Sequence, residues 1–253
     1  MPAPTDAPTP SRLTLGDITI DVVFKDIKNI HLSVHPPLGQ VSMVAPQRLQ
    51  LDTLRLFAIA RLGWIRQQRQ KMQTQERETP REYLERESHR VWGQRYLLQV
   101  IETAAAPTVA LTPRYLQLTC RPGTDAAHRQ EILDEWYRQQ LRQAVTPLID
   151  RWASVMGVQV RKVFVQRMKT RWGSCNPVQG HLRLNTELAC KPPECLEYIV
   201  VHEMAHLLEP SHNARFHALL DGFMPSWRHR RDQLNRLPVR HQDWTQGQAH
   251  SSP

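Results

Sequence analysis

The chain has 253 residues, a net charge of +9 at pH 7 and a pI near 9.8. This length suffices for one large or two small domains that fold without disulfides, and the four cysteines form no C-x2-C pair, which argues against a structural zinc finger. No run of 18 apolar residues and no basic-plus-apolar leader occurs, so we expect a cytoplasmic protein that neither spans a membrane nor is exported.

The N-terminal half predicts a β-rich accessory region at residues 13–122. Residues 1–12 and 242–253 lack apolar periodicity and are predicted to be disordered tails. Within the accessory region, short runs rich in apolar and β-branched residues predict strands, and residues 51–77 have the apolar spacing of one helix. The predicted strands are residues 18–24, 30–34, 40–45, 96–101, 109–111 and 115–119.

The C-terminal half predicts a catalytic domain at residues 123–241. Residues 126–153 have apolar side chains at helical spacing, and Gly157 ends that helix. The segments that follow Gly157 are shorter than this helix, and their apolar residues do not have helical spacing. Two strands are predicted, at residues 158–168 and 181–187, with a loop at residues 171–176 between them.

A second helix of this half begins near Pro192 and contains the sequence His-Glu-Met-Ala-His at residues 202–206. Positions four apart lie on one helical face, so both imidazoles can reach one metal ion while Glu203 is offset toward its open side. Catalytic zinc usually takes three protein ligands and keeps its fourth position for water. Because Pro210 favours a turn after the helix, His212 returns toward the pair and is the candidate third ligand.

The alternative is a helix that simply exposes two histidines, because a bare HExxH match also arises by chance. The pair here lies in an apolar helix, where unpartnered imidazoles and a carboxylate would each cost on the order of 1–3 kcal/mol if buried. A bound cation removes that cost. The sequence therefore predicts a Zn²⁺ site with ligands His202, His206 and His212 and with Glu203 as the general base.

Three segments of the chain resemble the YgjP-like metallopeptidase family, whose members are zincins related to the SprT-like proteins. TRWGSC at residues 170–175 and GHLRLN at residues 180–185 resemble the family's TRWGSC…G-x-(I/L)-x-(I/L)-N signature, and VVHEMAHLLEPSHNARF at residues 200–216 resembles its histidine block. The resemblance extends over residues 13–237. It implies an α+β fold with a β-rich N-terminal half and a zincin-like catalytic domain, together with the same three ligands and a catalytic Glu203.

Several neighbouring residues are weighed for smaller roles. Glu209 is a rival third ligand, although it directly precedes the predicted turn. Cys175 is weighed as an inhibitory fourth ligand against a small packing residue, Asn185 as a residue that fixes the loop or a histidine, and Trp172 and Phe216 as packing residues. Four polar residues are considered for oxyanion stabilisation and none is selected: Arg171, His181, Arg215 and His217.

The favoured function is a zinc-dependent metallopeptidase that hydrolyses peptide bonds of a protein or peptide with a metal-activated water and Glu203 as general base. One alternative is a metal-dependent nucleoside triphosphate pyrophosphatase that acts on UTP, an activity attributed to a member of this family. Another is a DNA-associated, SprT-like protease. Basic clusters occur at residues 61–95 and 227–240, but glutamates interleave with the first, so nucleic acid is not favoured as a partner. Nothing in the sequence predicts an oligomeric state.

Overall fold

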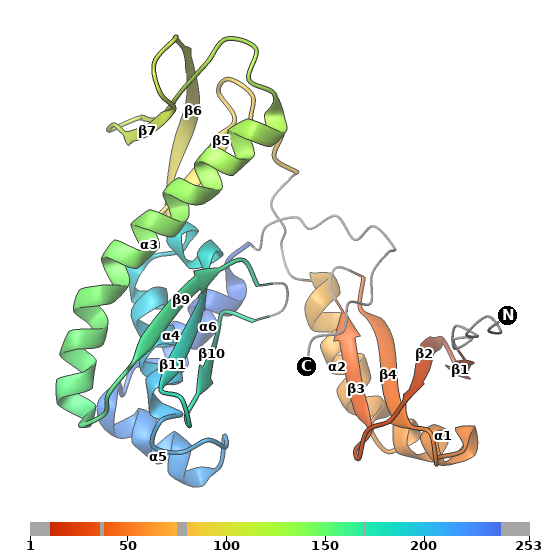
Figure 1. The fold of residues 1–253 in the computed structure, drawn as a ribbon. Coiled ribbons are helices and arrows are strands. Elements are labelled where there is room, and N and C mark those ends of the chain that lie inside the picture. Colours follow the sequence, from red (N-terminus) through yellow and green to blue (C-terminus); the bar gives the residue numbers. More distant parts are fainter. Residues whose placement is uncertain (1–10, 36–37, 75–79, 169–170, 239–253) are drawn as a thin grey trace, which may run out of the picture. The chain divides into compact units, whose positions relative to one another are not determined.

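The computed structural model describes residues 11–35, 38–74, 80–168 and 171–238. The fold is α+β, as predicted, with three mixed sheets and six α-helices among the described residues (Figure 1). The chain divides into two compact units, Met1–Glu76 and Arg77–Pro253, which are taken separately below. The predicted tail at residues 242–253 and most of that at residues 1–12 lie outside the described residues.

The first unit is a four-stranded sheet followed by two helices. The sheet has the order β1-β2-β4-β3, in which β2 and β4 are parallel and the other pairs are antiparallel. Ser11 and Arg12, which were predicted as the end of a disordered tail, belong to the first strand, where Arg12 donates a hydrogen bond to Asp21 at 3.1 Å. The elements are β1 (Ser11–Leu15), β2 (Ile18–Lys25), β3 (His31–His35), β4 (Gln40–Pro46), α1 (Leu51–Ile59) and α2 (Leu62–Thr74).

The helix predicted at residues 51–77 is therefore two helices, which are separated at Ala60 and Arg61. Both pack their apolar positions on the sheet, where Leu54, Ala58 and Ile65 are buried against the inward side chains of the strands. Alternation along β2 buries every second residue at its start, as expected for a strand with one face on a core. The apolar spacing thus predicted helical structure correctly, but it did not predict the break of two residues between α1 and α2.

The second unit begins with another four-stranded sheet, in the order β5-β6-β8-β7. Its central strands β6 and β8 are parallel, and β5 and β7 pair with them antiparallel at the two edges. The sequence analysis predicted all of these strands except β5. The strands are β5 (Ser88–Val91), β6 (Gln94–Glu102), β7 (Thr108–Leu111) and β8 (Tyr115–Cys120).

The long helix α3 (Ala126–Met156) joins this sheet to the elements that follow it in the chain (Figure 1). Its start is capped by Asp125, whose carboxylate accepts a hydrogen bond from the backbone N–H of His128 at 2.8 Å. Its end is capped by Gly157 in the left-handed conformation, as the sequence predicted. The helix contacts β7 and β8 as well as β9 and α4, so it connects the two halves of the unit.

A three-stranded sheet and three helices complete the unit. The sheet has the order β10-β11-β9, in which β9 is parallel and β10 antiparallel to β11. Residues 173–176, predicted as part of a loop, form the edge strand β10, and the predicted strand at residues 158–168 is shorter. The elements are β9 (Lys162–Gln166), β10 (Gly173–Asn176), β11 (His181–Asn185), the 3₁₀ helix η1 (Thr186–Cys190), α4 (Pro193–Ala205), α5 (Ala214–Phe223) and α6 (Trp227–Arg236).

One hydrophobic core runs through the whole second unit. It includes Leu98 and Leu116 of the β5–β8 sheet, Leu141 of α3 and Met204 of α4, all of which are fully buried. The contacts therefore group the β5–β8 sheet with the catalytic elements, whereas the sequence-based boundary at residues 122–123 separates them. That boundary remains a prediction about domains. Among the described residues, no helix is both long and apolar enough to cross a bilayer.

Candidate metal centre

Helix α4 supplies most of the candidate site. Pro193 stands in its first turn, where a missing backbone N–H leaves no hydrogen bond unmade, and Glu194 lies near the positive end of the helix dipole. Most side chains of the helix are buried. These include Cys195 and Ile199, which lie on the same side of the helix as the histidines. The residues that face the site are thus held on a rigid, buried element.

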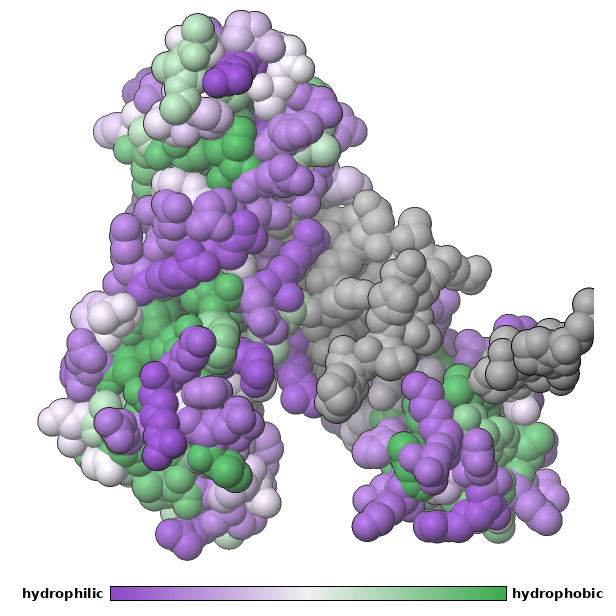
Figure 2. Space-filling view, in the orientation of Figure 1, coloured by the Kyte–Doolittle hydropathy of each residue, from purple (hydrophilic) through white to green (hydrophobic). Residues whose placement is uncertain are grey.

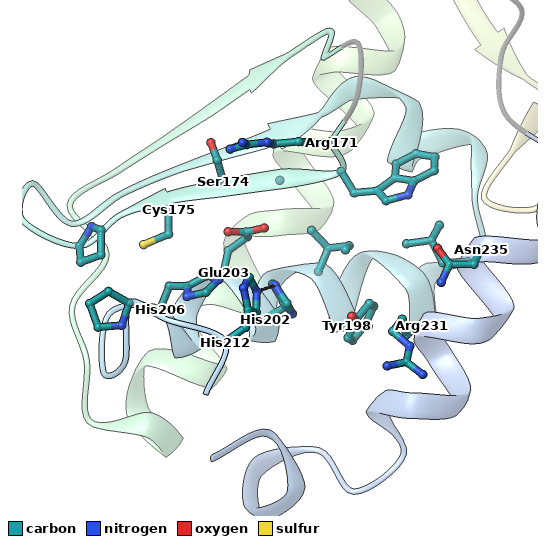
Figure 3. Close-up of a pocket in the computed structure, with 16 residues that line it drawn as sticks. Arg171, Ser174, Cys175, Tyr198, His202, Glu203, His206, His212, Arg231 and Asn235 are labelled. Atoms are coloured by element: carbon teal, nitrogen blue, oxygen red, sulfur yellow. Dashed lines mark hydrogen bonds between the residues drawn. The ribbon is translucent and has the colours of Figure 1, made fainter. Parts of the chain in front are cut away.

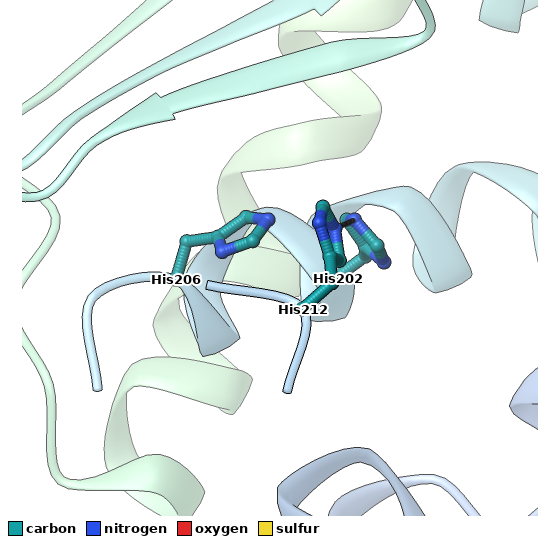
Figure 4. Close-up of side chains that lie close together, drawn as sticks. All are labelled: His202, His206 and His212. Atoms are coloured by element: carbon teal, nitrogen blue, oxygen red, sulfur yellow. Dashed lines mark hydrogen bonds between the residues drawn. The ribbon is translucent and has the colours of Figure 1, made fainter. Parts of the chain in front are cut away.

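The structure brings the three predicted histidines together (Figure 4). His202 lies on α4, His206 caps the end of that helix, and His212 lies in the following turn. One potential ligand nitrogen from each lies within 4.8 Å of the other two, and Nε2 of His202 and Nε2 of His212 are 3.1 Å apart. The predicted turn at Pro210 therefore returns the third imidazole to the pair.

Two hydrogen bonds shape this turn. The ring Nδ1 of His206 donates to the backbone carbonyl of Glu209 at 3.1 Å, and Asn213 accepts from the backbone N–H of Phe216 at 3.0 Å to begin α5. Phe216 packs beneath the three imidazoles, with its ring centroid 4.5 Å from that of His206. The ring of Phe216 thus has the packing role that the sequence predicted.

The rival ligand Glu209 is directed elsewhere. Its carboxylate accepts a hydrogen bond from the backbone N–H of Ser211 at 3.2 Å and lies 4.0 Å from Arg215. Among the described residues, the metal-capable cluster contains His202, His206 and His212 and does not contain this carboxylate. Glu209 instead orients His206, since its carbonyl accepts a hydrogen bond from Nδ1 of that ring and leaves Nε2 without a proton.

The donor set fits a divalent cation. Two imidazole nitrogens on one tetrahedral zinc are about 3.3 Å apart, because each Zn–N bond is about 2.0–2.1 Å. The His202–His212 separation of 3.1 Å is close to that value. In addition, Nδ1 of His202 is buried without a hydrogen-bond partner. Burial, reinforced by the neighbouring His206 and His212, lowers the pKa of His202 to about 3, so its ring is neutral and able to bind a metal.

Glu203 lies directly beside this cluster and is only 5% exposed. Burial raises the pKa of its carboxyl to about 8, and the positive charge of Arg171 lowers it in part. Its side chain packs under Gly173 of β10, where an added Cβ would stand 2.7 Å from Oε1 of Glu203. Only glycine leaves room for the carboxylate at that position. Sequence reasoning did not identify this contact, because it joins two distant elements.

The cluster lies in a cleft of about 570 Å³ (Figure 3). Residues of β10, including Ser174 and Cys175, line one wall, and α4 with its histidines lines the other. Arg231 and Asn235 of α6 close one end, next to Tyr198. The cleft therefore runs between the free edge of a sheet and the histidine-bearing helix.

The other predicted residues near the site have distinct positions. Asn185 fixes the loop and not a histidine, since its amide donates to the carbonyls of Met168 at 2.9 Å and Arg171 at 2.8 Å. Trp172 is half-buried and lines the cleft. Cys175 also lines it, and burial, with the charge of Glu203, raises the pKa of its thiol to about 11. The thiol is therefore protonated at neutral pH.

The four residues considered for oxyanion stabilisation differ in their position relative to the cleft. Only Arg171 lines the cleft. His181 packs against Phe164 on the sheet, and His217 stacks on Trp227 with ring centroids 5.7 Å apart. Tyr198, which sequence reasoning missed, also lines the cleft. Its signal was present, because it stands one helical turn before His202, and burial raises the pKa of its hydroxyl to about 12, which keeps it a proton donor.

Comparisons with known proteins now add to this geometry. No curated protein matches the chain. Two solved structures resemble part of it: the metallopeptidase zymogen abylysin of Pyrococcus abyssi, with 21% identity and a TM-score of 0.34, and the metallopeptidase zymogen jannalysin of Methanocaldococcus jannaschii, with 20% identity and a TM-score of 0.31. The matches cover 36% and 37% of this chain and 90% and 92% of those chains.

The family comparison covers much more of the chain. Residues 28–237 match the family described as YgjP-like, metallopeptidase domain. This range includes the three clustered histidines, Glu203 and the β10 wall of the cleft. The chain therefore belongs to the YgjP-like metallopeptidase family.

Proposed function

We propose that this protein is a zinc-dependent peptidase in which His202, His206 and His212 hold the metal and Glu203 acts as general base. The observation that supports this proposal best is the convergence of three imidazoles, within 4.8 Å of one another, beside a buried carboxylate in a cleft. Uncharged imidazoles are the ligands that zinc prefers in such sites. Family membership supplies the reaction class, a metallopeptidase.

Bound zinc would supply Lewis acidity, which polarises a carbonyl and lowers the pKa of water to about 7. A cation at the histidines would lower the raised pKa of Glu203, and its carboxylate would then take a proton from the attacking water and return it to the leaving amine nitrogen. Its burial and its contact with Gly173 hold the carboxylate in one place, so the proton acceptor is oriented before the substrate arrives. Tyr198, with a protonated hydroxyl in the same cleft, is available as a hydrogen-bond donor.

The edge strand β10 supplies a binding mode for the substrate. Of the described strands of its sheet, β10 pairs only with β11, and its other edge borders the cleft. An extended peptide can add to such an edge through backbone hydrogen bonds, which bind without requiring a particular side chain. The peptide bond would then pass over α4 and its histidines.

The test begins with purified full-length protein loaded with zinc. Elemental analysis should give one zinc per chain, and unfolded casein should be cleaved at a rate that a chelator abolishes and added zinc restores. UTP is incubated in parallel, because a phosphoanhydride hydrolase would act on it and leave casein intact. Cleavage of UTP without cleavage of casein or peptides would refute the proposal. The matched variant is Glu203→Gln, which preserves the size of the side chain but removes its basicity.

A further inference from the structure

The catalytic sheet is built from a segment without acidic residues. No aspartate or glutamate occurs between Asp150 and Glu187, a segment that contains β9, β10 and β11. The same segment contains seven arginines and lysines. A segment of this kind forms a surface that attracts anionic groups when its cationic side chains share a face.

Strand register places two of these seven side chains, Lys162 and Arg183, on one face of the sheet. Leu182 and Leu184 of β11 are fully buried toward the core, so Arg183 between them points to the opposite face. Arg183 pairs across the strands with Ser174 and Phe164, and these three form one row of that outer face. The neighbouring row consists of Asn176, His181 and Lys162.

The outer face and its borders are cationic. We use the name cationic face for Lys162 and Arg183 on this outer face together with three exposed arginines next to the ends of β9 and β10: Arg161, Arg167 and Arg171. None of these five side chains pairs with a carboxylate among the residues that the structure describes. The strands lie in front of α4 in Figure 1, and Figure 2 shows hydrophilic side chains in purple beside green apolar ones over the same region.

The cationic face continues into the cleft. Arg171 and Ser174 line the cleft wall, and Glu203 is the only acid among the described residues that line it. At the α6 end, Arg231 is already paired with the adjacent Asp232 at 3.0 Å, so it contributes less free charge. A substrate chain that leaves the cleft over β10 therefore meets cations that form no ion pair with a carboxylate among the described residues.

We propose that the cationic face binds aspartate and glutamate side chains of the polypeptide substrate, so that the enzyme favours bonds flanked by acidic residues. This inference rests on the proposed peptidase function. The arrangement around Phe164 favours a peptide over single-stranded nucleic acid. Nζ of Lys162 and Cζ of Arg183 lie over its ring, 4.9 and 5.4 Å from the centroid, and thus occupy the surface on which a base would stack.

The experiment uses three peptides that differ only in the residues flanking one cleavable bond: aspartate and glutamate, asparagine and glutamine, or lysine and arginine. With zinc-loaded full-length enzyme at low salt, kcat/KM for the acidic peptide should exceed that for the neutral peptide about tenfold, mainly through KM. This advantage should shrink as salt rises, because exposed charges are screened. Equal kcat/KM values for the acidic and neutral peptides would overturn the inference while leaving the peptidase proposal intact.

Two variants locate the effect. Arg171→Gln and the double variant Lys162→Gln with Arg183→Gln should each reduce the ratio of acidic to neutral kcat/KM at least threefold. Arg95→Gln changes an exposed residue of β6 in the β5–β8 sheet and should leave the ratio unchanged. A ratio that falls equally in all three variants would reflect net charge alone and would contradict the assignment to this face.

If no peptide is cleaved, the cationic face is tested by measuring how the acidic peptide binds to the Glu203→Gln variant. In that case the peptidase proposal fails, and fluorescence anisotropy of the labelled acidic peptide tests the cationic face directly. Saturable binding that weakens in the Lys162→Gln, Arg183→Gln double variant supports an acidic polypeptide as the partner. Tighter binding of a single-stranded oligonucleotide through the same two residues would overturn that choice.

Discussion

Gly173→Ala should disable catalysis without removing the metal. The added Cβ would stand 2.7 Å from Oε1, 2.8 Å from Cγ and 3.0 Å from Cδ of Glu203. Carbon atoms in contact prefer about 3.5–4.0 Å, so the carboxylate or β10 must shift by roughly 0.7 Å or more. Overpacking of this kind costs about 1–3 kcal/mol of stability. A displacement on the order of 1 Å at a reacting group lowers kcat by roughly 100-fold.

The assay compares kcat on casein-derived peptides, zinc content and melting temperature for Gly173→Ala and for Gly222→Ala. No atom would come within 4 Å of a Cβ at Gly222, and that glycine lies in α5, so alanine there should keep activity and raise stability slightly. Gly173→Ala should retain zinc, because the three atoms nearest to the added Cβ belong to Glu203 and not to a histidine. A wild-type kcat in Gly173→Ala would refute the reasoning, because it would mean that the added methyl group does not displace the carboxylate of Glu203.

Three further outcomes are expected. Glu203→Gln should keep zinc by elemental analysis and lose about 100-fold or more of kcat, and activity above a few per cent would remove it as the general base. His212→Ala should weaken zinc affinity at least tenfold in competition with a chelator, and an unchanged affinity would exclude it as a ligand. Burial alone would raise the pKa of Glu197, but the hydrogen bond from Arg230 at 2.7 Å and the charge of Arg151 prevail and lower it from its ordinary 4.5. The stability that this carboxylate contributes is therefore present above about pH 4.5 and is lost as pH falls through the lowered pKa. Glu197→Gln should lower the free energy of unfolding by about 1–3 kcal/mol at pH 7. Its melting temperature should also fall less than that of the wild type when the pH is lowered below about 4.5.

The sequence predicted those parts of the site that depend on local chain geometry. The spacing of His202 and His206 follows from the period of one helix, and the return of His212 follows from a turn at Pro210. Each of these steps involves neighbours within about a dozen residues. The structure brings all three imidazoles together as expected, while their roles as ligands remain predictions.

The parts that escaped prediction depend on partners far along the chain. Strand β10 reads Gly-Ser-Cys-Asn, without the apolar alternation of a strand, and is extended because it pairs with β11. Strand β5 is likewise defined by its pairing with β6. The contact between Gly173 and Glu203 has no sequence signal at all, since it depends on how closely a strand and a helix approach.

The continuous core of the second unit makes that unit a single cooperative body. Leu116 of the remote sheet and Met204 beside the histidines belong to one set of packed side chains, linked through α3. Unfolding either end exposes the apolar surface of the other, so a metal bound at the histidines would also stabilise the remote sheet. A ligand bound at the histidines would thus protect backbone amides in β6 and β8 from solvent exchange, although no atom of those strands lines the cleft among the described residues.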